Sequence, residues 1–246
     1  MGSYADLRPK IEESIAKLHE YRVALISAAV MGKIDVREST ETVTPERRAN
    51  PFFRRSVLAA EIVHRLHNEP TFGRVKLQKL LHLCEYHAQL AEIESSYYRD
   101  TNGPHDNQLM RSVESQLRQQ RWYGVVGRGR VGFQYIPLEQ TGGHSKYFDR
   151  YFRHKRAAID EVLNLFRQFD TQRCEIVSTL YAAWNDLLLT GQEVTDEAIL
   201  KEVLEHWHDS KRDIPEVRWR NALAWMREHR LVPVGFGKPT RQKEAE

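Results

Sequence analysis

The chain has 246 residues, of which 41% are hydrophobic and 29% are charged, and its net charge is +3. These proportions are typical of a soluble globular protein and exclude a disordered chain, while the length allows one large or two modest domains. It contains no run of about eighteen apolar residues that could span a membrane, and the N-terminus lacks the apolar segment of a signal peptide, so we expect a cytoplasmic protein.

The first predicted element is a long helix from Leu7 to Lys33, within a first domain at residues 1–37. Its seam repeats at spacings of four and three residues and passes through the small Ser14, which is typical of a helix that packs along another helix in a coiled coil. The positions predicted to form the helix-packing interface are Leu7, Ile11, Leu18, Tyr21, Leu25 and Ala28. The same spacing occurs in helices of an ordinary bundle, so periodicity alone leaves both interpretations open.

The residues of this helix also resemble a known family. The segment from Lys10 to Val36, with the small residues Ser27-Ala28-Ala29 and then Gly32, resembles the last helix of the specificity subunit of type I restriction–modification enzymes. The resemblance covers residues 7–38 and implies that the chain is the C-terminal part of such a subunit, followed by an unusual extension. In that family the helices hold two target-recognition domains apart and dock the methyltransferase subunits.

This resemblance implies a set of partners. They are the methyltransferase subunits, with the restriction subunit as a further candidate, and we also expect self-association through the N-terminal helix. The chain has no target-recognition domain, so DNA contact is expected to be weak and non-specific. The predicted function is therefore that of a non-catalytic helical assembly module in DNA restriction–modification and phage defence.

A helical domain is predicted at residues 55–140, after a polar linker at 38–54 that contains Pro45. Its predicted elements are helices at 56–67, 74–93 and 106–122, a loop at 100–104 and a β-hairpin at 123–137. Ser56 is the expected N-cap of the first of these helices. A helix followed by a hairpin in this way is similar to a winged helix.

Two short motifs in this domain carry a second resemblance. The string VKLQKLL at residues 75–81 begins one predicted helix, and Gly103-Pro104 lies in the predicted loop. With the helix and hairpin that follow, over residues 56–138, these motifs resemble the Panacea or SocA-like domain, which is known chiefly from antitoxins. The resemblance implies an alternative function, in which the protein neutralises a toxin by direct binding. In physical terms the motifs are the start of an amphipathic helix and a loop fixed by Pro104, so neither carries catalytic chemistry.

The remaining residues are predicted to form a C-terminal helical bundle at 141–237. Its expected helices cover 145–169, 171–191, a segment that begins at Thr195, and Pro215 to His229. Thr195 is an N-cap candidate. Residues 231–237 are expected to form a short strand, and residues 238–246 a disordered tail. The predicted fold class is therefore mainly α, with a coiled-coil-like arm, a helical domain that includes a small winged-helix-like hairpin, and a helical bundle.

Basic residues are concentrated between Arg118 and Arg156, where acidic residues are few. Such a cluster attracts phosphate groups or an acidic protein, but it can equally be a solvated face. The candidate contact residues for a nucleic acid or an acidic partner are Arg128, Arg130, Arg153 and Lys155. Aromatic residues in the same stretch, such as Tyr147 and Tyr151, could stack on bases, although core spacing explains most of them.

The sequence has no local signature of an active site. It contains no nucleophile elbow, phosphate loop, dinucleotide-binding fingerprint or nuclease motif. Its histidine pairs, such as His206 and His208, belong to no metal-ligand pattern. Cys84 and Cys174 are too few for a disulfide framework and are expected to be reduced. We therefore expect no catalytic residue, no metal site and no cofactor.

Overall fold

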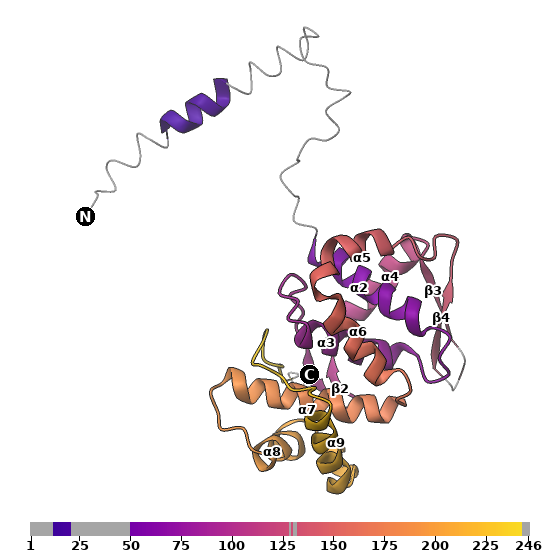
Figure 1. The fold of residues 1–246 in the computed structure, drawn as a ribbon, viewed down its shortest axis with the longest axis vertical. Coiled ribbons are helices and arrows are strands. Elements are labelled where there is room, and N and C mark those ends of the chain that lie inside the picture. The colour runs from indigo at the N-terminus through magenta and orange to yellow at the C-terminus, as the bar shows by residue number, and fades with distance from the viewer. Residues whose placement is uncertain (1–11, 21–49, 128, 130–131, 243–246) are drawn as a thin grey trace, which may run out of the picture. The chain divides into compact units, whose positions relative to one another are not determined.

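The computed structural model of the chain describes residues 12–20, 50–127, 129 and 132–242. The chain divides into two units, Met1–Arg48 and Ala49–Glu246. In the first unit, residues 12–20 form a helix, and every one of them is exposed. The second unit holds the other described elements and is mainly helical (Figure 1).

Helices make up most of the second unit. They are α2 (Pro51–Leu66), α3 (Arg74–His87), α4 (Asn107–Gln119), α5 (Ser145–Phe152), η3 (Arg153–Lys155), α6 (Arg156–Phe166), α7 (Thr171–Leu189), α8 (Asp196–His206), η4 (Asp209–Asp213) and α9 (Glu216–Glu228). The strands are β1 (Tyr98–Asp100), β2 (Gly103–His105), β3 (Tyr123–Gly127) and β4 (Phe133–Pro137). The mainly α class is therefore confirmed. None of the described helices is both long and apolar enough to cross a membrane.

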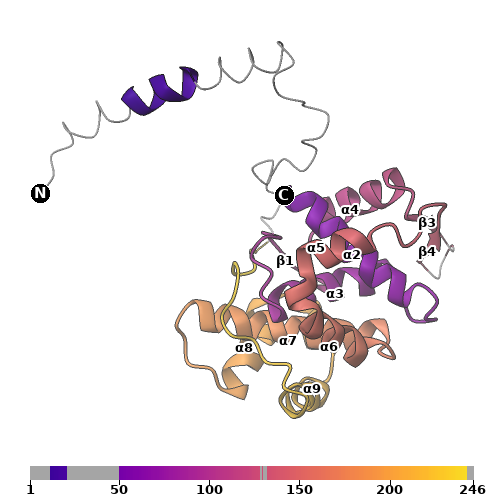
Figure 2. The same ribbon diagram turned by 45° about the horizontal axis from the view of Figure 1, so that its top comes forward.

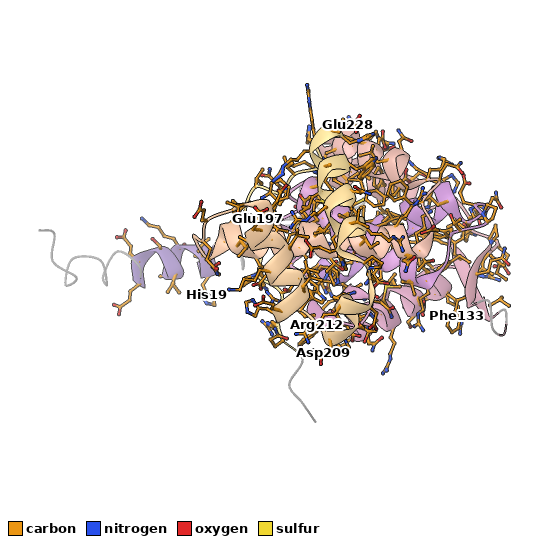
Figure 3. All side chains as sticks on the ribbon, turned by 90° about the horizontal axis from the view of Figure 1, so that it is seen from below. His19, Phe133, Glu197, Asp209, Arg212 and Glu228 are labelled. Carbon is orange, nitrogen blue, oxygen red and sulfur yellow. The ribbon has the colours of Figure 1, made fainter. Side chains whose placement is uncertain are left out.

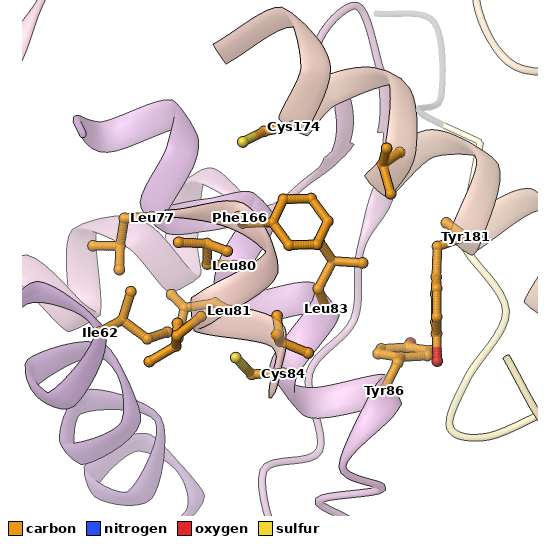
Figure 4. Packing of buried hydrophobic residues seen from close by; sticks show 14 of the residues in the cluster. Ile62, Leu77, Leu80, Leu81, Leu83, Cys84, Tyr86, Phe166, Cys174 and Tyr181 are labelled. Carbon is orange, nitrogen blue, oxygen red and sulfur yellow. The ribbon is translucent and has the colours of Figure 1, made fainter. Parts of the chain in front are cut away.

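The core of the second unit is built around α3. This helix packs against α2, α6 and α7, which Figure 2 shows gathered about it. Leu77, Leu80 and Cys84 of α3 meet Ile62 of α2 and Phe166 of α6, and all five side chains are fully buried (Figure 4). Burial of apolar surface contributes about 25 cal/mol per Å². Burial of this cluster therefore contributes to the stability of the unit.

Polar side chains cap several helices where the first backbone N–H groups have no partner in the helix. The side chain of Asn50 caps α2, with Pro51 in the first helical position, where its missing N–H costs nothing. The prediction that Ser56 caps this helix is wrong, because Ser56 lies buried within α2. The predicted cap of α8 is confirmed, since Thr195 Oγ1 accepts the N–H of Ala198 at 3.1 Å.

The segment 100–104, expected to be a loop, is part of a hairpin. β1 and β2 pair antiparallel, with Asp100 opposite Gly103, so the connection between the two strands is only two residues long. β2 then contacts both α3 and α7. The predicted second hairpin is confirmed: β3 and β4 pair antiparallel, with Val125 opposite Tyr135, and follow directly after α4.

The predicted continuous helix at 145–169 is wrong. α5 ends at Phe152, the short turn η3 intervenes, and α6 begins at Arg156. The two parts pack on different helices, because α5 contacts α2 and α6 contacts α3. The bend therefore lets one stretch of sequence cover two helices of the core.

The expected strand at 231–237 is absent from the described structure. The backbone of this segment forms hydrogen bonds with a side chain of α7 and not with another strand. The side chain of Asn185 accepts the N–H of Phe236 at 3.0 Å and donates to its carbonyl at 2.8 Å. The expected disorder is also wrong for residues 238–242. The N–H of Thr240 donates to Asp186 at 3.0 Å, and Arg241 forms a parallel bridge with β1. Residues 243–246 lie outside the described part of the chain.

Candidate functional site

The predicted helix-packing interface is described at one of its positions. Leu18 is 69% exposed on the helix 12–20, and Ile15, which the predicted seam did not include, is 51% exposed. Residues three apart are neighbours on a helix surface, so Ile15 and Leu18 form one apolar patch. The sequence signal for Ile15 was its spacing of four from Ile11. The remaining predicted positions, which are Leu7, Ile11, Tyr21, Leu25 and Ala28, lie outside the described residues.

The two motifs of the second resemblance meet inside the second unit. Lys79 of α3 is completely buried, and its Nζ donates a hydrogen bond to the carbonyl oxygen of Pro104 in β2 at 2.6 Å. A buried ammonium needs such a partner, because an unpaired buried charge is costly. Sequence reasoning singled out both motifs as local features of a helix and a loop. It missed the bond between them because the residues are 25 positions apart.

The backbone conformation and the packing at position 103 both require glycine. The φ of Gly103 is +87°, a conformation that glycine adopts far more readily than other residues. A Cβ atom added at this position would lie 2.6 Å from Oγ1 of Thr179 in α7. The glycine therefore allows β2 to lie directly against α7, and this contact brings the carbonyl of Pro104 within reach of Lys79.

Two further buried lysines flank the same region. Lys76 Nζ donates to the backbone carbonyls of Arg167 and Phe169 at 2.9 and 2.7 Å. Lys211 Nζ donates to the carbonyl of Thr101 at 2.6 Å and pairs with Glu175 at 2.7 Å. Each of the two ammonium groups joins chain segments that are distant in sequence. Lys76 links α3 to the segment between α6 and α7, and Lys211 links η4 to α7 and to the turn of the first hairpin.

The charge state of Lys79 is shifted by its surroundings. Burial is the largest cause and the nearby Lys211 the next, and together they lower the pKa of Lys79 to about 7. Burial likewise lowers the pKa of Lys211, although Glu175 offsets part of the effect. A lysine that is partly neutral near pH 7 has the chemistry of a base or a nucleophile. Lys79 is nevertheless completely buried, so its position favours a structural role.

A second buried group, His82 of α3, lies among aromatic rings. The ring centroids of Tyr86 and Tyr97 lie 4.6 and 4.9 Å from its own, and that of Tyr181 lies at 6.2 Å. Neither ring nitrogen has a hydrogen-bond partner within the described residues. Burial, followed by the charge of Lys79, lowers the pKa of His82 to about 3, so the imidazole is neutral near pH 7. It serves as a packing residue.

The predicted contact residues of the basic stretch are described at two positions. Arg153 and Lys155 lie in η3, where Arg153 is exposed and Lys155 half-buried. Neither forms an ion pair with any described residue, so both remain available to a partner. Arg128 and Arg130 lie outside the described residues. The structure therefore brings together two of the four predicted residues.

Other members of the basic stretch are already engaged. Arg121 pairs with Glu139 at 2.9 Å, and Arg156 pairs with Asp149. The aromatic candidates for base stacking are also occupied. Tyr147 and Tyr151 stack on each other with centroids 6.4 Å apart, and the ring of Phe53 forms a T-shaped pair with each of them. This arrangement favours packing over base stacking.

The described residues contain no group of three or more His, Cys, Asp or Glu side chains that could hold a metal ion. Cys84 and Cys174 are free thiols and are buried. Burial raises the pKa of the Cys84 thiol, and it raises that of Cys174 to about 12. Both groups are therefore protonated near pH 7 and are weak nucleophiles.

Comparison of the chain with protein family models, with curated protein sequences and with solved structures found no match.

Proposed function

We propose that the chain is the C-terminal part of a type I restriction–modification specificity subunit and acts as a non-catalytic assembly module. In this proposal the N-terminal helix docks the methyltransferase subunit by helix packing, with the restriction subunit or a second copy of the chain as further partners. The observation that carries the proposal is the exposed apolar patch of Ile15 and Leu18 on the helix 12–20. The resemblance of residues 7–38 to the last specificity-subunit helix supports it.

The energetics of this helix favour a partner. Complete burial of one leucine or isoleucine side chain is worth about 1.5–3 kcal/mol. Short helices are marginally stable alone in water, and most helices in proteins are stabilised by packing of an apolar face. Ile15 and Leu18 are 51% and 69% exposed, so more than half of this burial energy is not yet realised on the helix alone. A second helix packed against the patch of Ile15 and Leu18 would recover it.

The second unit is proposed to be a winged-helix-like and bundle-like extension that supports assembly. The direct succession of α4, β3 and β4 is the feature that supports the winged-helix comparison. The extension would contact DNA only weakly, through Arg153 and Lys155 with Arg128 and Arg130. Within the described residues, its most unusual ionisable groups are the buried lysines, which tie the fold together and do not reach solvent.

The proposal is tested by capture of the full chain on an immobilised methyltransferase subunit of a type I restriction–modification system. We expect capture of the full chain and loss of capture when residues 1–36 are removed. The thermal unfolding of both forms is the control, because the second unit has its own core and should unfold at a similar temperature. Equal capture of the two forms, or capture of neither, would refute the docking role.

A second candidate function is an antitoxin of the Panacea type. The observation that favours it is the hydrogen bond between Lys79 and Pro104, which joins both motifs of that resemblance in one buried cluster. In this case the second unit, and not the N-terminal helix, would bind the toxin. Co-expression with a toxin gene adjacent to this gene should then restore growth even without residues 1–36, a result that the first proposal does not predict.

A further inference from the structure

A cavity of about 310 Å³ opens between α7 and α9. These helices pack against each other in the second unit, as Figures 1 and 2 show. Each contributes residues spaced three or four apart, so each presents one face to the cavity. The lining residues are Phe169, Arg173, Ile176 and Val177 at the α7 side, and Arg218, Asn221, Ala222 and Trp225 of α9.

The inner surface of this cavity is largely apolar. Ile176 and Val177 are almost fully buried beneath it. The rings of Phe169 and Trp225 lie with their centroids 4.9 Å apart. The ring of His229 also stacks on Trp225, with the centroids 4.5 Å apart and an angle of 26° between the ring planes. Trp225 is therefore packed against two other rings, and with Phe169 it gives the cavity an apolar wall.

The polar groups of the cavity are cationic. Arg173 lies over the ring of Phe169 at 5.8 Å, and Arg218 donates to the side-chain oxygen of Gln172 at 2.7 Å. Neither arginine forms an ion pair with a carboxylate among the described residues. The residues that line the cavity in the described structure include no acidic side chain. Two guanidinium groups beside an apolar wall suit an anion, because arginine binds planar oxyanions through paired N–H donors.

The acidic residues of α9 do not neutralise this site. Glu216 lies at the start of the helix and pairs with Arg220 at 2.7 Å. Glu228 lies at the other end of α9, where Figure 3 labels it. Neither is among the residues that line the cavity. Among the residues that line the cavity, the charged side chains are therefore those of Arg173 and Arg218.

We propose that this cavity binds a small organic anion, with a carboxylate or a similar oxyanion between Arg173 and Arg218 and an apolar body against Trp225 and Phe169. Its volume lies at the lower end of the range for small-molecule sites, about 300–1,000 Å³. The site spans only two turns of each helix, which is short for a docked protein segment. The few convergent polar groups would fix the orientation of the ligand, and the apolar wall would supply most of the contact area.

The experiment is a fluorescence titration of the full chain with 8-anilinonaphthalene-1-sulfonate, an anion attached to aromatic rings. We expect saturable binding of one dye molecule per chain. Arg173→Gln combined with Arg218→Gln should raise the dissociation constant by about tenfold or more, since charge-assisted hydrogen bonds are lost. Ala222→Trp, which fills the cavity, should abolish the saturable signal. Arg150→Gln, an exposed arginine of α5, is the matched control and should change nothing.

Displacement of the dye identifies the ligand class. 3-Phenylpropionate should displace it, and the neutral 3-phenylpropanamide should not. Thermal unfolding of each variant shows whether the fold is retained, and the two arginine substitutions keep the test valid if Ala222→Trp fails to fold. Dye binding that is absent, or unchanged in the double arginine variant, would overturn the proposal. Displacement by the peptide Glu-Glu-Phe-Glu-Glu at lower concentration than by 3-phenylpropionate would assign the site to a protein partner and would also overturn it.

Discussion

The helix 12–20 and α3 share several residue types but have opposite surroundings. Both mix leucine or isoleucine with lysine, histidine and glutamate. α3 buries almost everything it carries, including Lys76, Lys79 and His82. The helix 12–20 exposes every residue, including Ile15 and Leu18. The side chains of α3 are buried by other segments of the same chain. Those of the N-terminal helix are proposed to be buried by another chain.

The difference also changes what a charged side chain does. On the helix 12–20, Lys17 pairs with Glu13 in solvent at 2.7 Å, and such an exposed pair contributes little to stability. On α3, Lys79 is desolvated and holds the carbonyl of Pro104, so its position depends on the packing of β2 and α7. The contact between β2 and α7 is therefore the first place to test the difference between these two regions.

The largest expected effect on the second unit is that of Gly103→Ala. A left-handed φ costs a non-glycine residue about 1–2 kcal/mol, and the clash with Thr179 adds an overpacking cost of about 1–3 kcal/mol. We expect a loss of roughly 3 kcal/mol in the free energy of unfolding, measured by denaturant titration. Gly142→Ala is the matched control, because Gly142 has a nearly equal φ of +85° and no heavy atom within 4 Å of the added Cβ. If both variants lost the same amount, the contact with α7 would have no special role.

A smaller effect is predicted for the pH dependence of stability. The folded pKa of Lys79 is about 7, against an ordinary lysine pKa of 10.5, so between these values the unfolded state binds a proton that the folded state lacks. The contribution of this group to the free energy of unfolding therefore rises with pH from about 7 to 10, by at most about 1.4 kcal/mol per pH unit. Lys79→Met should remove this rise, as seen in urea titrations at pH 7.5 and 9.5. Identical pH profiles for the two proteins would show that Lys79 keeps an ordinary pKa.

The smallest expected effect concerns DNA. Contacts through exposed basic residues should give salt-sensitive binding with a dissociation constant on the order of 10⁻⁴ to 10⁻⁶ M. Arg153→Glu with Lys155→Glu should weaken it further in a fluorescence anisotropy titration, whereas charge reversal of Arg121, which pairs with Glu139, should matter less. Tight, sequence-selective binding at physiological salt would contradict the assembly role and indicate a DNA reader.

Local signals in the sequence were sufficient to predict many of the helices and the β3–β4 hairpin. The cap of α8 followed from Thr195 and the acidic residues after it, and the β3–β4 hairpin followed from alternation around glycines. The start of α2 was missed because Asn50 and Pro51 were assigned to the linker. The break after Phe152 could not be predicted, since the apolar spacing continues through it and only the packing on two different helices causes the bend.

The candidate sites were less predictable, because they depend on contacts between distant residues. The string at 75–81 reads as an amphipathic helix, and nothing local shows that Lys79 would be buried against Pro104. The order of residues 238–242 likewise depends on Asp186 of α7, which accepts from Thr240. By contrast, the apolar patch at Leu18 follows directly from the spacing of the first helix.

The measurement that tests the central claim most directly compares Leu18→Asp with Ala16→Asp in the full chain. Both add one negative charge to the helix 12–20, and Ala16 lies outside the predicted seam. The readout is the affinity for the immobilised methyltransferase subunit, together with the thermal transition of the second unit. Our account predicts that Leu18→Asp abolishes binding, that Ala16→Asp largely preserves it, and that neither shifts the transition. Equal affinities for the two variants would contradict the claim that this helix packs against another chain.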